Sequence, residues 1–220
     1  MILFVPAYDE PTRSNLAVAK RLPEQQGEVR LFGDDASAHM LRSAIVATAG
    51  DAKRPLYVMS HGMRDEIRAQ GGGAALDTAD GLHLLLLTRR SVFAFACHTA
   101  TVLGRVAATH GVVWWGYTGA IQSPVSDDPL AGLFVEIFQF LRDSFAGAAS
   151  REARSQVLEE LRRRCSEAER AVDDAFEADP SLDPSEALLC LLHLWDRLRV
   201  WLPGHDVPEH HPNARPPALM

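Results

Sequence analysis

Five short apolar runs mark the first half of the chain, and most of them are continuously apolar rather than alternating. They cover residues 2–5, 29–32, 56–59, 92–96 and 112–117. A strand that is covered on both faces shows this continuous pattern, which is typical of a parallel sheet. The pattern therefore predicts five buried strands.

Amphipathic stretches lie between these runs, at residues 15–22, 37–49, 82–89 and 99–110. Strands that alternate with helices build a sheet with helices on both faces, because each helix must bury one apolar stripe. The first half of the chain is therefore predicted to form a doubly wound α/β sandwich.

The second half of the chain has the periodicity of helices. Apolar residues recur at helical spacing from Leu130 to Phe145, with Pro129 suited to the first turn. Further helices are predicted at 151–176 and 185–202. We expect an α/β domain at 1–148, a helical C-terminal extension packed on it at 149–203, and a flexible, proline-rich tail at 204–220.

The amino-acid composition of the chain argues against several classes of protein. Among 220 residues, 47% are hydrophobic, and 29 acidic residues outnumber 22 basic ones to give a net charge of −7. An anionic protein repels phosphate backbones and anionic lipids, which argues against nucleic-acid and membrane partners. Neither a signal peptide nor a run of about 18 apolar residues is evident. Three scattered cysteines fit a reducing cytoplasm, with no disulfide framework and no metal site.

Two strand ends carry reactive side chains. The run 56–59 leads into Ser60, His61 and Gly62, and the run 92–96 leads directly into Cys97. Ligands of an open parallel sheet bind beyond the carboxyl ends of its strands. If these strands are neighbours, Cys97 can act as a nucleophile and His61 as its base, while a helix that begins just after Cys97 favours the thiolate. The backbone N–H groups of Gly62 and Cys97 would form an oxyanion hole.

The segments 55–62, 80–100 and 111–119, with the aspartates before the helix at Leu130, resemble the caspase-like cysteine peptidases, and most of all the prokaryotic CHAT branch. The resemblance implies a caspase-like three-layer sandwich and endopeptidase activity without a cofactor. It also implies a protein substrate as partner, which in some members is a pore-forming effector of a defence or cell-death system. After Cys97, only Thr99 agrees with the Glu-Thr-Gly that CHAT sequences often carry.

The same resemblance suggests cleavage after Arg or Lys, because an acidic residue after the fifth strand can select a basic side chain. Asp127 and Asp128 occupy that place, and Asp9 ends the first strand at the same rim. A partly desolvated carboxylate binds a guanidinium through two hydrogen bonds. Alternatively, Asp127 or Asp128 caps the helix that follows.

Other interpretations stay open. Residues 58–62 imitate the G-x-S-x-G elbow of serine hydrolases around Ser60, although Val58 replaces the first glycine. Cys97 could be an inert core residue and His61 a turn residue. The apolar helix at 185–202 could also serve a non-catalytic interaction module.

Overall fold

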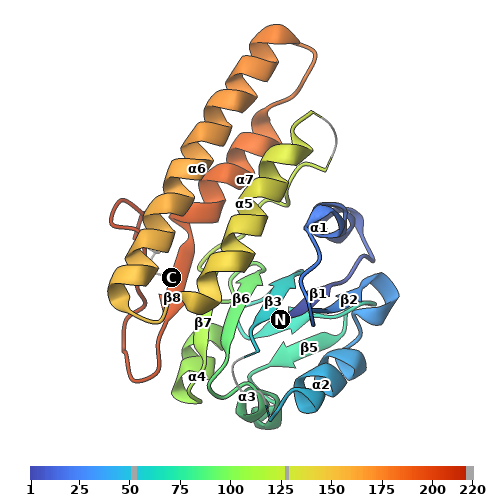
Figure 1. Cartoon of the computed structure of the whole chain (residues 1–220), viewed down its shortest axis with the longest axis vertical. Helices are drawn as coiled ribbons and strands as arrows, with labels where there is room; N and C mark the ends of the chain where they lie inside the picture. Colours follow the sequence, from blue (N-terminus) through green and yellow to red (C-terminus); the bar gives the residue numbers. More distant parts are fainter. Residues whose placement is uncertain (51–53, 127–128, 217–220) are drawn as a thin grey trace.

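The computed structural model describes residues 1–50, 54–126 and 129–216, which form an α/β protein around a six-stranded sheet (Figure 1). The strand order is β2-β1-β3-β6-β7-β8. Five neighbouring strands run parallel, and β8 pairs antiparallel with β7. The strands are β1 (Ile2–Val5), β2 (Val29–Phe32), β3 (Leu56–Met59), β6 (Ser91–Phe95), β7 (Val113–Tyr117) and β8 (Leu198–Trp201).

Helices cover both faces of the sheet, which confirms the predicted layered α/β architecture. Neighbouring residues on a strand point to opposite faces, so Trp114 and Trp115 are buried in two different cores. One core includes α1 (Glu10–Arg21), α5 (Ala131–Ser144), α6 (Arg151–Ala178) and α7 (Ser185–Asp196). The other includes α2 (Ala38–Ala47), α3 (Gly81–Leu86) and α4 (Leu103–Thr109). Figure 1 shows α6 and α7 extending together beyond the sheet.

The third C-terminal helix is shorter than the predicted range of 185–202. Helix α7 ends at Asp196, and Leu198–Trp201 forms β8 at the edge of the sheet. Leu198 and Val200 enter one core, while Trp201 enters the other. This alternation suits a strand that is covered on both sides. The segment 149–203 is therefore more than a helical extension, because it supplies a strand of the central sheet.

A small antiparallel hairpin follows β3 and was absent from the prediction. It consists of β4 (Glu66–Arg68) and β5 (Ala74–Asp77). Both strands are short, and their ends are polar, so they lack the long apolar run that marks a central strand. Gly71 and Gly72 in the turn both have φ of 83°, a backbone conformation that favours glycine.

Residues 204–216, predicted to belong to a flexible tail, pack against the rest of the protein. Glu209 pairs with Val200 through an isolated β-bridge, and its carboxylate accepts two hydrogen bonds from Arg154 at 2.6 and 2.9 Å. Arg215 pairs with Asp196 at 2.6 Å. The prolines therefore prevent regular structure here without preventing packing. Within the described ranges, no helix is long and apolar enough to cross a membrane.

Candidate active site

The predicted dyad lies at the carboxyl ends of two paired strands. Strand β3 pairs in parallel with β6, and the register places Met59 opposite Phe95. The Ser60 backbone N–H still donates to the Phe95 carbonyl, so His61 and Cys97 follow the paired ends of the two strands. Both residues line one cavity of about 120 Å³. The expectation that the two strands are neighbours and that both side chains reach the same rim is confirmed.

The imidazole of His61 is held by Asp9, which follows β1. The distance from His61 Nε2 to Asp9 Oδ2 is 2.7 Å. The other oxygen, Asp9 Oδ1, accepts hydrogen bonds from the Thr12 backbone N–H at 3.1 Å and the Thr12 hydroxyl at 2.6 Å, which completes the N-cap of α1. When Nε2–H donates to Asp9, the lone pair of the neutral ring is on Nδ1. His61 then has Nδ1 free to act as a base.

Asp9 stays ionised at neutral pH. Its partial burial raises the pKa of the carboxyl, but the hydrogen bonds from Thr12 and His61 outweigh burial and hold the pKa below its usual value. The sequence analysis assigned Asp9 to substrate binding. In the structure both of its oxygens are already engaged, so the carboxylate is placed to orient His61.

Cys97 is the only one of the three cysteines that is not buried. Its sulfur accepts a hydrogen bond from the backbone N–H of Ile121 at 3.3 Å. The pKa values of the Cys165 and Cys190 thiols are raised, mainly by burial, which keeps both protonated and unreactive. Among the cysteines, Cys97 alone combines access with a hydrogen-bond donor at the sulfur.

The helix expected directly behind Cys97 begins later than predicted. Helix α4 starts at Leu103, and residues 97–102 form turns, with His98 at a φ of 61°. The His98 backbone N–H donates to the Gly119 carbonyl instead of to a helical partner. A helix N-terminus therefore does not support the sulfur. Instead, the Cys97 sulfur accepts a hydrogen bond from the Ile121 N–H, which lies in the loop after β7.

This loop is anchored to the end of α7 by hydrogen bonds. The Thr118 backbone N–H donates to the Arg197 carbonyl at 3.1 Å, and the Gln122 N–H donates to His193 Nδ1 at 3.2 Å. The Arg197 guanidinium also donates to the Ala120 carbonyl. Burial lowers the pKa of His193 to about 4, with the positive charge of Arg197 acting in the same direction, so the ring stays neutral and able to accept.

Arg197 also places positive charge near the Cys97 sulfur. Burial lowers the pKa of Arg197, and Arg215 acts in the same direction, whereas negative charge on Asp196 and Cys97 acts in the opposite direction. Sequence reasoning missed both His193 and Arg197. The sequence signal that could have identified them is their polarity, because His193 lies within an unusually apolar helix and Arg197 lies just after it.

Gly62 touches the Cys97 turn so closely that no side chain fits. A Cβ atom at Gly62 would lie 2.5 Å from the Cys97 carbonyl oxygen and 2.7 Å from Thr99 Cγ2. Neither the Gly62 nor the Cys97 backbone N–H donates to a backbone carbonyl of the described residues.

The sequence also offered Ser60 as an alternative nucleophile and Asp127 and Asp128 as substrate-binding residues. Ser60 is 6% exposed, and its hydroxyl donates to the Arg68 carbonyl at 2.7 Å rather than to a base. Asp127 and Asp128 lie outside the described residues.

A groove of about 520 Å³ adjoins the dyad cavity and shares Pro11 and two loop residues with it. Glu10 and Glu186 are among the residues that line this groove.

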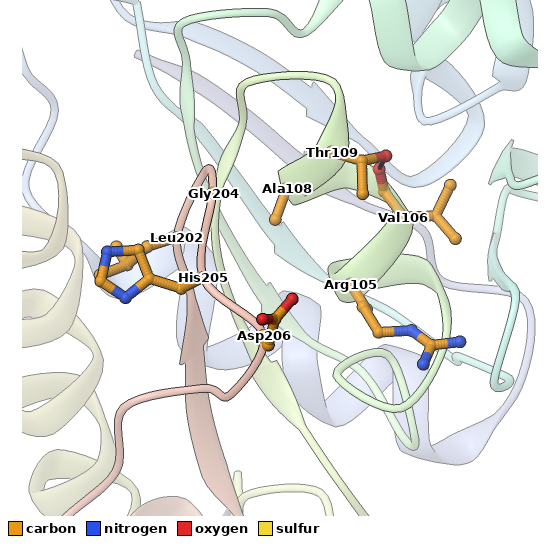
Figure 2. A pocket seen from close by; sticks show the side chains of 8 residues that line it. All are labelled: Arg105, Val106, Ala108, Thr109, Leu202, Gly204, His205 and Asp206. Atoms are coloured by element: carbon orange, nitrogen blue, oxygen red, sulfur yellow. Dashed lines mark hydrogen bonds between the residues drawn. The ribbon is translucent and has the colours of Figure 1, made fainter.

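A larger cleft of about 770 Å³ lies at the opposite edge of the sheet, between α4 and the turn after β8 (Figure 2). Figure 2 shows the side chain of Arg105 directed away from His205 and Asp206, so the charged groups do not converge. In the part of the chain that the structure describes, no group of three or more His, Cys, Asp or Glu side chains is placed to hold a metal ion.

The dyad cavity therefore combines a thiol with an imidazole that a carboxylate orients. A nucleophile, its base and a group that orients the base are the parts that acyl transfer requires. Comparisons with protein-family models, curated proteins and solved structures found no match for this chain. The functional argument consequently depends on the geometry of the site and on the sequence pattern.

Proposed function

We propose that the chain is a cysteine endopeptidase of caspase-like architecture, similar to the CHAT branch. The observation that carries the proposal is that His61 and Cys97 line one cavity at the ends of the paired strands β3 and β6, with Asp9 hydrogen-bonded to the imidazole. The three-layer arrangement around a mostly parallel sheet supports the caspase-like assignment.

The proposed reaction proceeds through an acyl-enzyme. His61 Nδ1 takes the thiol proton, and Cys97 Sγ attacks the carbonyl carbon of the scissile peptide. The N–H groups of Gly62 and Cys97 stabilise the oxyanion. The C–N bond then breaks, and His61 gives its proton to the leaving amine. Water, activated by His61, hydrolyses the thioester, which releases the carboxylic acid and restores the thiol.

Asp9, Ile121 and Arg197 support these steps without bonding to the substrate. Asp9 fixes the ring orientation and stabilises the imidazolium that forms during the reaction. The Ile121 N–H donates a hydrogen bond to the Cys97 sulfur, and the Arg197 guanidinium interacts electrostatically with it. Together these contacts assist formation of the attacking ion pair.

For specificity, we propose cleavage after a basic residue of a protein partner. Two carboxylates, Glu10 and Glu186, and one guanidinium, Arg13, line the groove next to the dyad cavity, and the carboxylates provide acceptors for a long cationic side chain. The resemblance to CHAT proteins suggests a pore-forming effector as the partner. In this proposal Glu10 and Glu186 bind the basic side chain of the substrate, which is the role predicted from the sequence for Asp127 and Asp128.

A peptide-library cleavage screen tests the proposal with three proteins: wild type, Cys97→Ala and Ser60→Ala. We expect wild type and Ser60→Ala to cleave after Arg or Lys, and Cys97→Ala to cleave nothing. Activity that survives in Cys97→Ala and disappears in Ser60→Ala would instead identify a serine hydrolase. Cleavage restricted to Asp-containing peptides would contradict the acidic groove. An inactive wild type would favour a non-catalytic interaction module.

A further inference from the structure

The loop after β7 contacts both the nucleophile and the last turn of α7. The Ile121 backbone N–H donates to the Cys97 sulfur at 3.3 Å. The next amide along the chain, the Gln122 N–H, donates to His193 Nδ1 at 3.2 Å. Two adjacent amides of this loop therefore bind the sulfur and the helix.

A single peptide unit connects His193 to the Cys97 sulfur. The Gln122 N–H and the Ile121 carbonyl belong to the same planar unit, and in a trans peptide these two groups point in opposite directions. The N–H donates to His193 Nδ1, and the carbonyl accepts the Cys97 thiol, with 3.8 Å between sulfur and oxygen. The direction of this peptide, and with it the contact to the sulfur, therefore depends on the acceptor that His193 provides.

His193 is a constant acceptor because its ring is buried and neutral. The residue is 6% exposed, and burial lowers the pKa of the ring to about 4, so at neutral pH Nδ1 keeps its lone pair while Nε2 carries the proton. Apart from His193 and Asp196, the buried residues of α7 are apolar. An apolar side chain would avoid the cost of desolvating an imidazole. The hydrogen bond to the loop is the feature that distinguishes His193 from its neighbours.

The other hydrogen bonds between this loop and the end of α7 involve residues further from the sulfur. The Thr118 N–H donates to the Arg197 carbonyl, and the Arg197 guanidinium donates to the Ala120 carbonyl. Among the hydrogen bonds of the described residues, the contact with His193 is the one that holds the 121–122 peptide from the side of α7.

We propose that His193 is a positioning residue of the active site, which holds the 121–122 peptide against the Cys97 sulfur by accepting the Gln122 N–H. This inference rests on the proposed endopeptidase function. The imidazole of His193 does not bond to the substrate. It restricts where the thiol lies relative to its base, and a displacement of about 1 Å in an active site can cost about 10²-fold in rate.

His193→Leu and His193→Asn test the inference as a pair. Leucine removes the acceptor, whereas the asparagine carbonyl oxygen takes the same place along the side chain as Nδ1 and can accept the same hydrogen bond. For a peptide with Arg before the scissile bond, we expect kcat/KM to fall by about 10–10²-fold in His193→Leu and to stay within about 3-fold of wild type in His193→Asn. Asparagine is the poorer helix former, so a role in helix stability alone would give the opposite order.

His83→Leu is the matched control for this substitution. His83 is also 6% exposed and also accepts a hydrogen bond, from Arg42 at 2.8 Å, but it lies on α3, which covers the other face of the sheet. We expect this variant to cleave the Arg peptide at close to the wild-type rate. Losses of equal size in His83→Leu and His193→Leu would show a general effect of removing a buried imidazole and would overturn the inference.

Hydrogen exchange of backbone amides, measured by NMR, gives a reading that needs no substrate. In His193→Leu the Ile121 and Gln122 amides should exchange about 10-fold faster than in wild type, and in His193→Asn at close to the wild-type rate. Phe4 lies in β1, which is paired on both sides, so its amide reports on opening of the whole sheet and should be unchanged. Equal acceleration at Phe4 would make His193 a residue of the core and would overturn the inference.

The two measurements distinguish failure of this inference from failure of the proposed function. If wild type cleaves the Arg peptide and His193→Leu cleaves it equally well, or if His193→Asn is as slow as His193→Leu, the role of His193 is wrong and the endopeptidase proposal stands. If wild type cleaves no peptide of the library, the endopeptidase proposal is wrong, and the exchange rates of the Ile121 and Gln122 amides then decide whether His193 holds the loop.

Discussion

Replacing His61 by alanine is expected to lower kcat/KM for the best peptide substrate by about 10²–10⁴-fold, the usual contribution of a general acid–base group. The imidazole is the base nearest to Cys97 on the neighbouring strand, and without it the thiol must lose its proton to water. Steady-state cleavage at neutral pH measures the loss. Because the His61 side chain is 36% exposed and its hydrogen-bond partner is Asp9, we expect the variant to remain folded.

His110→Ala provides the matched control for this result. His110 follows the last turn of α4 and precedes β7, so it lies at the edge of the sheet opposite the dyad. We expect it to cleave the same peptide at close to the wild-type rate. Equal losses in the two variants, or full activity in His61→Ala, would contradict the assignment of His61 as the base.

Gly62→Ala should have an effect of similar size for a different reason. The added Cβ would lie 2.5 Å from the Cys97 carbonyl oxygen and 2.9 Å from the Ala96 Cβ, so the two turns that carry the dyad must separate. Displacing one oxyanion donor costs about 10²–10³-fold in rate, and moving the base away from the thiol adds to that. We expect kcat to fall by at least about 10²-fold, together with a lower Tm.

Gly132→Ala makes the same chemical change where there is room. Gly132 lies in the first turn of α5, and nothing stands within 4 Å of the position that its Cβ would take. Alanine has the higher helix propensity, so this variant should keep full activity and an unchanged or slightly higher Tm. A fully active Gly62→Ala would show that the close approach of the two turns has no part in catalysis.

The central part of the fold follows from the sequence because its signals are local. Strands β1, β2 and β3 begin and end where the apolar runs do. The position of His61 beside Cys97 followed once the two strands were taken as neighbours, since parallel strands carry the residues after them to one rim. Continuous apolar runs and the residues shortly after them are therefore enough to place His61 and Cys97 at the same end of the sheet.

The other features depend on contacts between distant residues. Strand β8 follows an apolar helix directly, and only pairing with β7 marks it as a strand. The Asp9–His61 contact joins residues 52 positions apart. Asn15 has the polarity of an exposed helix position, yet it is 4% exposed and lines the dyad cavity. None of these pairings leaves a periodic pattern along the chain.

The most direct test of the central claim is to react the wild-type protein with a peptide acyloxymethyl ketone that ends in arginine and to locate the adduct by tandem mass spectrometry. The account predicts a single adduct on the Cys97 sulfur, none on Cys165 or Cys190, and a much slower reaction in His61→Ala. An adduct on Ser60, or no adduct on a Cys97 that iodoacetamide still alkylates, would contradict it.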